Sequence, residues 1–310
     1  MGVFAGRRDR GGLAGNVPRL SQAYRSGVPT GGQAVCVGAG PTTVGNVSVS
    51  DEAHELAERV ERAASLLVLT GAGLSTAAGI LDFRGPDGIW TRDPAAERAS
   101  DIDVYLGEPA VRSAYWRGLL ARGRAEPTAG HWAITRRVEG GRVRVVTQNT
   151  DGLHRATGLD DELVEIHGSE RTTRCRRCGR VVETERVLAR VRNGEADPRC
   201  QRWGDEGSCG GVLTPEVVRF GEALDRRRWR TAMAWAHTAD LVVAVGTSLS
   251  VAPASTLVEV TRGAVAIVNG EPTPFDPYAA LVVRDDIQTA LALWNETTTR
   301  PVRGPGARAI

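Results

Sequence analysis

The sequence predicts an α/β fold: a Rossmann-like parallel sheet with helices on both faces, plus a small inserted zinc-ribbon domain. Short apolar runs rich in Val and Leu alternate with helical segments, as in a parallel sheet that is covered on both sides. A glycine-rich turn follows the first of these runs, which is where such folds bind diphosphates. Four of the five cysteines lie close together, between positions 175 and 209.

The regular elements are expected to begin near Asp51, because Ala53, Leu56 and Val60 recur at helical spacing. The segments expected to form strands are Leu66–Thr70, Val143–Thr147, Leu163–Ile166, Leu241–Gly246, Ala264–Val268 and Leu281–Val283. Further helices are expected at Arg112–Arg122, Ala129–Glu139 and Arg226–Thr238. Strands and helices in this order predict a catalytic core at 51–297, with the zinc-binding module inserted at about 170–213.

The two ends of the chain lack strand or helix periodicity. Residues 1–50 are rich in Gly, Ser, Thr and Pro and contain five arginines against one aspartate. We interpret them as a disordered arm; an organelle transit peptide and a misplaced start codon are the alternatives. Residues 298–310 are expected to form a flexible tail.

The bulk composition sets limits on partners. A chain of 310 residues with 41% apolar content can bury a sizeable core, and the net charge of +2 gives no reason to expect a nucleic-acid partner. No apolar run reaches the roughly 18–20 residues of a membrane span, so we expect a cytoplasmic protein without a membrane partner. Every basic residue is an arginine. The oligomeric state is not predicted.

The cysteine spacing indicates a metal site. Cys175 and Cys178 are separated by two residues, and Cys200 and Cys209 by eight. Four thiolates suit tetrahedral Zn²⁺, and a four-cysteine site without an open position is structural rather than catalytic. The surrounding sequence is too polar to form a core unaided, so metal binding would supply folding energy. The alternative is four unrelated cysteines; Cys36, which stands apart, is interpreted as a free thiol.

Polar or glycine-containing motifs follow several of the predicted strands. After the first strand comes the turn Gly71-Ala-Gly-Leu-Ser-Thr-Ala-Ala-Gly-Ile-Leu-Asp-Phe-Arg84. The second strand is followed by Gln148-Asn-Thr-Asp151, which offers two amides and a carboxylate; an ordinary turn is the alternative. Such residues lie at the carboxyl edge of a parallel sheet, where ligands bind.

Among five histidines, His167 is the best candidate for a general base, because it ends a strand and directly precedes a glycine and the cysteine insert. His131 and His154 are interpreted as structural hydrogen-bonding groups, and the other two as surface residues. After the insert, Pro215–Glu222 is expected to be extended, so that it could pair with a peptide by strand addition or simply link two elements.

These motifs, in this order, resemble the sirtuins, the NAD-dependent protein deacylases, over about residues 55–290. The resemblance implies that NAD and an acyl-lysine peptide or protein meet in a cleft between a large Rossmann-like domain and a small domain with one structural Zn²⁺. It implies His167, Asn149 and Asp151 as catalytic residues. The implied NAD-binding residues are Gly71, Ala72, Ser75, Asp82, Phe83, Arg84, Gln148, Asn149, Asp151, Gly246, Thr247, Ser248 and Asn269. The implied zinc ligands are Cys175, Cys178, Cys200 and Cys209, and the implied acyl-lysine channel consists of Val217, Val218, Phe220 and Gly221.

The implied reaction is NAD-dependent deacylation, with deacetylation the first expectation and nicotinamide and O-acyl-ADP-ribose as products. The alternatives are an NAD-dependent protein mono-ADP-ribosyltransferase and an NAD-sensing module without turnover. A dehydrogenase is disfavoured because the first turn lacks a full G-x-G-x-x-G. Retention of His167 favours the deacylase over the transferase.

Three residues depart from the usual sirtuin pattern. Leu81 stands where proline is common, Thr150 where isoleucine is common, and Arg219 where an aromatic residue often stands. Relatives that remove acidic acyl groups carry a Tyr-x-x-Arg pair, whereas Gly118 occupies the fourth position of the motif that begins at Tyr115 here. We therefore expect no strong preference for acidic acyl groups, and leave long-chain acyl groups open.

Overall fold

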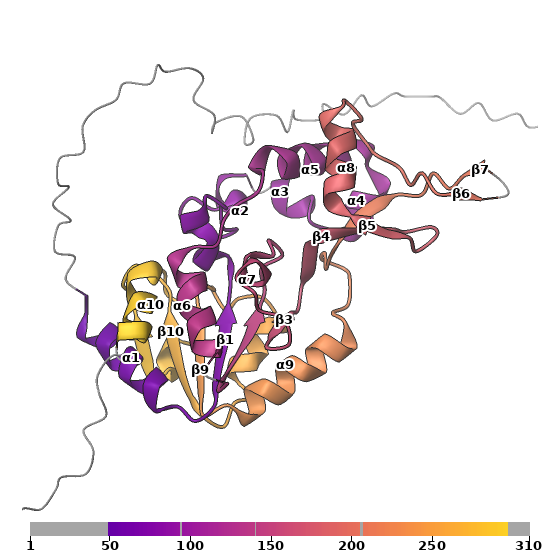
Figure 1. Ribbon diagram of the computed structural model, residues 1–310. Coiled ribbons are helices and arrows are strands. Elements are labelled where there is room, and N and C mark those ends of the chain that lie inside the picture. Colours follow the sequence, from indigo (N-terminus) through magenta and orange to yellow (C-terminus); the bar gives the residue numbers. More distant parts are fainter. Residues whose placement is uncertain (1–48, 94, 140, 205–206, 297–310) are drawn as a thin grey trace, which may run out of the picture.

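The computed structural model describes residues 49–93, 95–139, 141–204 and 207–296 (Figure 1). The predicted arm at 1–50 lies outside the described residues except for its last two positions, and the predicted tail at 298–310 lies wholly outside them.

The strands of the large domain are β1 Leu66–Thr70, β2 Val143–Thr147, β3 Leu163–Glu165, β9 Leu241–Val245, β10 Ala264–Val268 and β11 Leu281–Val283. Its helices are α1 Asp51–Arg62, α6 Ala129–Val138, α7 Leu153–Ala156, α9 Arg226–Thr238 and α10 Ile287–Glu296, with short 3₁₀ turns η1 Ala72–Ala78, η2 Ala254–Val258 and η3 Asp276–Tyr278.

The six strands of the large domain form one parallel sheet in the order β11-β10-β9-β1-β2-β3. The central strand β1 pairs with β2 on one side and β9 on the other, with Val68 opposite both Val145 and Val243. All five residues of β1 are buried, as a strand covered on both faces requires. The predicted Rossmann-like sheet is therefore confirmed, and two of its strands end one residue earlier than expected.

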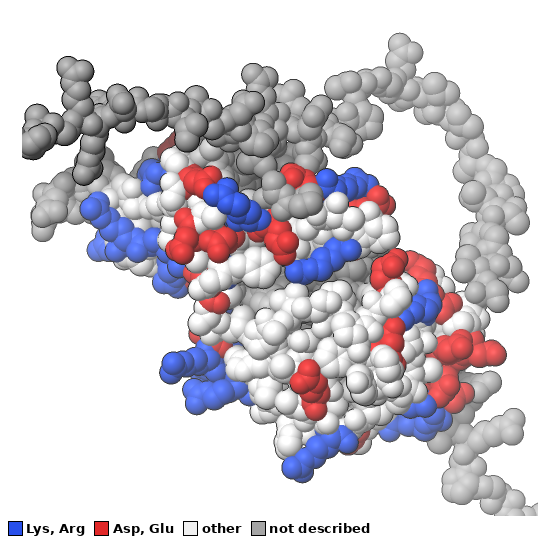
Figure 2. Space-filling model, turned by 180° about the vertical axis from the view of Figure 1, so that it is seen from behind, with Lys and Arg blue, Asp and Glu red and all other residues white. Residues whose placement is uncertain are grey.

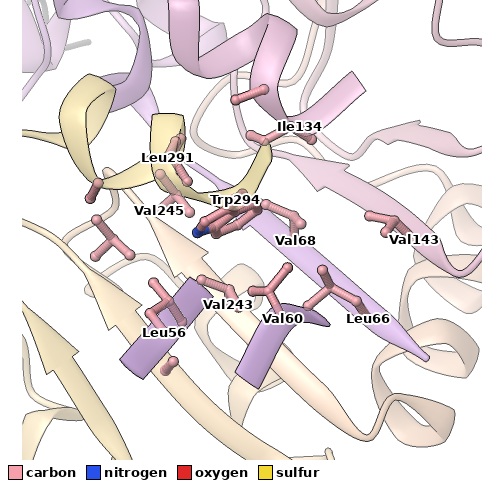
Figure 3. Close-up of a cluster of buried hydrophobic side chains, with 14 of the residues drawn as sticks. Leu56, Val60, Leu66, Val68, Ile134, Val143, Val243, Val245, Leu291 and Trp294 are labelled. Carbon is pink, nitrogen blue, oxygen red and sulfur yellow. The ribbon is translucent and has the colours of Figure 1, made fainter. Parts of the chain in front are cut away.

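Helices cover both faces of this sheet (Figure 1). On one face α1, α6 and α10 pack together, and Trp294 of α10 is fully buried beside Leu56, Val60 and Ile134 (Figure 3). On the other face α9 and η2 pack against the sheet through small residues such as Ala232. This packing fixes the direction of the strands and the position of their carboxyl ends.

The small domain consists of the inserted segment and two helices that precede it. Its elements are α4 Ile102–Gly107, α5 Pro109–Arg122, α8 Thr184–Arg192, β4 Gly168–Cys175, β5 Val181–Glu183, β6 Trp203–Gly204, β7 Gly207–Ser208 and β8 Leu213–Val217. The short helices α2 Ile89–Arg92 and α3 Ala95–Arg98 lie along the chain between η1 and α4. Trp116 and Leu119 of α5 pack against Val187 and Val191 of α8, so this domain has its own small core.

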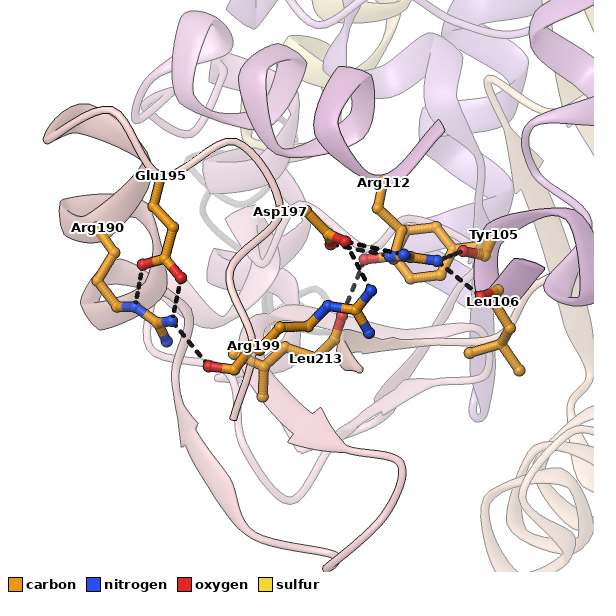
Figure 4. A network of polar contacts seen from close by, with 8 residues as sticks. All are labelled: Tyr105, Leu106, Arg112, Arg190, Glu195, Asp197, Arg199 and Leu213. Atoms are coloured by element: carbon orange, nitrogen blue, oxygen red, sulfur yellow. Dashed lines mark hydrogen bonds and ion pairs between the residues drawn. The ribbon is translucent and has the colours of Figure 1, made fainter. Parts of the chain in front are cut away.

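An ion pair ties the inserted segment to α5. The guanidinium of Arg112 donates from Nε and Nη2 to both carboxylate oxygens of Asp197 at 2.8 Å, and its Nη1 donates to the carbonyls of Tyr105 and Leu106 (Figure 4). The side chain of Arg112 is only 2% exposed. Asp197, which lies in a polar insert, is thus paired with a buried arginine of α5.

Charged residues are spread over the described surface. On the face seen in Figure 2, basic and acidic side chains are interspersed rather than gathered into one basic patch. Within the insert, Arg174 pairs with Glu216 and Arg192 with Glu185. None of the described helices combines the length and apolarity needed to cross a bilayer.

Candidate functional site

The glycine turn after β1 is held by backbone contacts with the turn after β9. The amide of Gly73 donates to the carbonyl of Gly246 at 2.9 Å, and a Cβ on Gly71 would lie 2.6 Å from that same carbonyl oxygen. Gly246 itself has φ of +60°, and a Cβ there would lie 2.4 Å from the amide nitrogen of Leu74. Only glycine fits these positions, so the two turns form a close backbone cradle at the carboxyl edge of the sheet.

Three of the predicted residues join in one hydrogen-bonded cluster above this cradle. Asn149 donates from Nδ2 to the carbonyl of Gly71 at 3.0 Å and to Oγ of Ser75 at 3.1 Å. The hydroxyl of Ser75 donates to Oδ2 of Asp151 at 2.8 Å, and Oδ1 of Asp151 accepts the amide of Leu153. Asn149 and Ser75 are buried, so the cluster fixes the carboxylate of Asp151 relative to the glycine turn.

His167 lies directly beside this cluster, between β3 and β4. Its Nδ1 is 3.0 Å from the carbonyl oxygen of Gln148, and a carbonyl can only accept, so Nδ1 carries the proton. The neutral ring therefore has its free lone pair on Nε2. Burial lowers the pKa of His167 from its ordinary value, an effect that the carbonyl of Gln148 partly opposes. His167 is thus a neutral base with a defined accepting atom.

The predicted adenosine half of the site surrounds the ends of β9 and β10. The amide of Gln148 donates from Nε2 to Oγ1 of Thr247 at 2.9 Å, which joins the β2 and β9 turns. Ser248 and Asn269 are half-buried, and the side chain of Asn269 donates to the carbonyl of Glu271 at 2.7 Å. These residues lie at the same sheet edge, because each follows a parallel strand.

Phe83 of the predicted NAD-binding loop is joined to Phe220 of the predicted substrate segment through Trp90, which was not among the predicted site residues. Phe83 packs on Trp90 with ring centroids 4.6 Å apart, and Trp90 packs on Phe220 at 5.6 Å. The guanidinium of Arg84 lies 4.5 Å from the centre of the Trp90 ring. Asp82 closes the loop by accepting the amide of Gly85 at its Oδ1. The spacing of Phe83 and Trp90, seven residues apart across a Gly-Pro-Asp-Gly turn, was the available signal.

The predicted acyl-lysine segment continues from β8, which ends at Val217, into a turn at 219–222, so it is extended over a shorter stretch than the expected 215–222. The amide of Val218 donates to the carbonyl of His167 at 2.8 Å, so the segment runs beside this histidine. Phe220 donates its amide to Ser100 and accepts that of Ile102, which anchors the other side of the segment. Gly221, with φ of +86°, ends it.

Arg219 points away from these contacts into the small domain. Its guanidinium carbon lies 3.9 Å from the ring centre of Tyr105 and 4.5 Å from that of Tyr115, and the residue is 7% exposed. Among the described residues neither Nε nor Nη2 of Arg219 has a hydrogen-bond partner. Tyr115 donates its hydroxyl to Glu170. The cation is stabilised by aromatic faces, and the departure at position 219 is accommodated by stacking.

The four clustered cysteines fit a structural zinc ion. Their sulfur atoms all lie within 4.8 Å of one another, with Cys175–Cys209 and Cys178–Cys200 at 3.7 Å. This exceeds the ~2.05 Å of a disulfide, whereas Zn–S bonds of ~2.3 Å in a tetrahedron separate neighbouring sulfurs by about 3.8 Å. Backbone amides of Arg177 and Cys178 point at Cys175, as they do toward a thiolate. Four cysteine ligands fill a tetrahedral zinc site, so the described residues leave no open position at which the metal could act in catalysis.

Comparison with known proteins identifies the family. The sequence model of the Sir2 family matches residues 71–253, more than half of the chain. The chain is therefore a member of the Sir2 family, and the resemblance to sirtuins is confirmed.

Individual relatives agree with this assignment. An NAD-dependent protein deacetylase 2 of Streptomyces coelicolor is 44% identical over 231 residues, which cover 72% of this chain and 93% of the relative. An NAD-dependent protein deacetylase of Sulfolobus acidocaldarius is 38% identical, covering 78% of this chain and 93% of the relative. A solved Sir2 structure with a p53 peptide and NAD⁺ superimposes with a TM-score of 0.69 at 30% identity, covering 79% of this chain and 98% of the other.

Proposed function

We propose that this protein is an NAD-dependent protein-lysine deacylase, with acetyl-lysine as its first substrate class. The observation that carries the proposal is the neutral His167, whose Nδ1 is fixed on the carbonyl of Gln148 and whose Nε2 is free to accept a proton. The deacetylase names of relatives that this chain matches over most of their length support the same reaction. A Sir2 structure containing deacetylated p53 peptide and 3′-O-acetyl ADP ribose also matches, with a TM-score of 0.71 and 30% identity.

The glycine cradle fits the diphosphate of NAD. Gly71 and Gly246 allow the β1 and β9 turns to pack against each other, so both turns lie at the carboxyl edge of the sheet, where parallel α/β folds bind phosphates. When bound, NAD supplies a ribose carbon from which nicotinamide can leave. The remaining predicted contacts follow from position: Gln148, Thr247 and Asn269 follow β2, β9 and β10 at one edge of the sheet, where ribose hydroxyls and the adenine would be held.

Asn149 and Asp151 would hold the nicotinamide end of the site. Asn149 is buried and bonded to Gly71 and Ser75, so its orientation is set before substrate binds. The carboxylate of Asp151 belongs to the same cluster through its bond with Ser75, and it can accept a hydrogen bond from a carboxamide N–H group. Such prior ordering lowers the cost of aligning the ribose with the acyl oxygen of the substrate.

His167 would then act on the ribose. Once the acyl oxygen has bonded to the ribose carbon that nicotinamide leaves, Nε2 of His167 would remove a proton from a ribose hydroxyl, whose oxygen can then attack the acyl carbon. The bond from the acyl carbon to the lysine nitrogen would break, the amine would leave with the proton, and one water molecule would be consumed in forming the ester. A base with a pKa below its ordinary value stays neutral at physiological pH and is ready to accept. The products are nicotinamide, the free lysine and O-acyl-ADP-ribose.

The acyl-lysine substrate would lie against Val217, Val218, Phe220 and Gly221. The segment runs beside His167 through the amide of Val218. Phe83 and Phe220 are 44% and 40% exposed, so two aromatic faces are available to apolar parts of the substrate. None of these residues carries a charge that could pair with an acidic acyl group, which agrees with the expectation against acidic acyl groups.

Mass spectrometry of reaction products tests the proposal. Purified, zinc-loaded protein is incubated with NAD and peptides carrying acetyl-, succinyl- or myristoyl-lysine, alongside reactions without NAD. We expect NAD-dependent free lysine and O-acyl-ADP-ribose, with the acetyl peptide consumed faster than the succinyl peptide. ADP-ribose attached to protein, with all acyl peptides intact, would instead identify the transferase alternative. Cytoplasmic location also stays a prediction, which cell fractionation tests.

A further inference from the structure

The zinc knuckle touches the substrate segment at one charged contact. Arg176 lies between Cys175 and Cys178, and its Nη2 donates to Oε1 of Glu222 at 2.7 Å while its Nε donates to Oγ1 of Thr214 at 3.1 Å. The amide of Arg176 is also bonded, to the carbonyl of Val212. Both the backbone and the side chain of this residue are therefore positioned by the metal-binding module.

Glu222 also contacts the backbone of the segment that precedes it. Its second oxygen, Oε2, accepts the amide of Arg219 at 3.1 Å, and its own amide donates to the carbonyl of Arg219 at 3.0 Å. One carboxylate thus bridges the knuckle and the backbone between Val218 and Phe220. The side chain of Glu222 is 19% exposed, so solvent competes weakly with this bridge.

The side chain of Arg219 fastens the same backbone on its other side. It is stacked between Tyr105 and Tyr115, whose hydroxyls donate to the carbonyl of Leu213 in β8 and to Glu170 in β4. Residue 219 is consequently held by its amide and by its side chain, both through the small domain. The neighbours on either side are the residues proposed to line the acyl-lysine channel.

We propose that Arg176 and Glu222 are positioning residues for the acyl-lysine substrate, which join the zinc knuckle to the Val217–Gly221 segment. The proposal rests on the proposed function for its substrate. It explains how a metal site that takes no part in the chemistry affects the reaction: the knuckle fixes Arg176, Arg176 fixes Glu222, and Glu222 fixes the amide of Arg219.

The test compares R176M, E222Q and the double variant with wild type, using R192A as the matched control. Arg192 lies in the same module and pairs with Glu185, but both side chains are more than half exposed. Loss of the bridge is expected to raise KM for an acetyl-lysine peptide about three- to tenfold, with kcat and KM for NAD within about twofold. The double variant is expected to resemble either single variant, because each removes the same contact.

Two further measurements separate positioning from metal loss. Zinc content is expected to remain one ion per chain in all four variants. Hydrogen exchange of the peptide covering 217–221 is expected to accelerate in R176M and E222Q but not in R192A, since the side chain of residue 222, which accepts the amide of Arg219, is no longer held by a charged partner. Unchanged exchange, or an unchanged KM for the peptide despite faster exchange, would overturn the proposal. An inactive wild type would refute the proposed function. Hydrogen exchange of the 217–221 peptide in R176M would still decide whether Arg176 holds that segment.

Discussion

Two buried histidines beneath the cofactor turn give the protein a predicted acid sensitivity. His131 accepts the amide of Thr128 at Nδ1, so its proton is on Nε2; His154 has Nε2 2.9 Å from the hydroxyl of Thr70, which itself donates to Thr147. His154 therefore carries its proton on Nε2, and its Nδ1 is an acceptor. The two rings lie 4.8 Å apart, and neither His131 Nε2 nor His154 Nδ1 has a hydrogen-bond partner among the described residues.

The loss of stability at low pH follows from the lowered pKa values of the two histidines. Burial lowers the pKa of His131 from 6.5 to about 4, and burial together with the charge of His131 lowers that of His154 well below its ordinary value. Below pH 6.5 the unfolded chain binds protons that the folded chain refuses, so the free energy of unfolding falls as the pH is lowered. For His131 alone, with a pKa near 4 in the folded state, the loss between pH 7 and pH 5 is about 2 kcal/mol, at ~1.4 kcal/mol per pH unit below 6.5.

Urea unfolding at pH 7, 6 and 5 measures this loss. Wild type is compared with H131Q and with H54Q, an exposed position on α1, at each pH. The difference in unfolding free energy between wild type and H131Q is expected to shrink by about 2 kcal/mol from pH 7 to pH 5, since the glutamine has no proton to gain. The control should follow wild type. A pH dependence that is equal in wild type and H131Q would refute the assignment of a buried, neutral His131.

Three other substitutions test the cradle, the metal site and the stacked arginine. G246A is expected to destabilise the protein by about 2 kcal/mol and to abolish the thermal shift caused by NAD, because its φ is positive and a Cβ would meet Leu74. C200S is expected to lose zinc by elemental analysis and to make the small domain protease-sensitive, with the large domain retained. R219F is expected to raise the unfolding free energy by about 1–3 kcal/mol in the same urea assay, because phenylalanine can keep the contact with Tyr105 and Tyr115 while it removes a buried cation whose Nε and Nη2 have no hydrogen-bond partner among the described residues. A thermal shift with NAD in G246A, zinc retained in C200S, or a lower unfolding free energy in R219F would each contradict the corresponding prediction.

The large domain could be predicted from sequence because its signals are local. Val- and Leu-rich strands such as Leu66–Thr70 are buried on both faces, so their composition alone distinguishes them from helices. Parallel pairing then brings residues that follow strands, such as Gln148 and Gly246, to one edge. The cysteine spacing likewise indicated a metal site, since a tight knuckle such as Cys175–Cys178 already sets the geometry of two ligands.

The parts that escaped prediction depend on contacts between distant segments. Asp197 in a polar insert gave no sign that it would pair with Arg112, which is 85 positions away and buried. Trp90 joins the cofactor loop to Phe220 only through tertiary packing. Arg219 was recognised only as a departure from the usual family pattern. Its contact with Tyr105 and Tyr115 follows from the placement of α4 and α5, which periodicity does not give.

Product analysis of a His167→Ala variant tests the central claim most directly. O-acetyl-ADP-ribose formed from NAD and an acetyl-lysine peptide is quantified by mass spectrometry for wild type, H167A and the exposed-position control H237A. Removal of a general base typically costs 10²–10⁴-fold, so we predict at least a hundredfold loss in H167A and an unchanged rate in H237A. Product formation by H167A at the wild-type rate would contradict the assignment of His167 as the base.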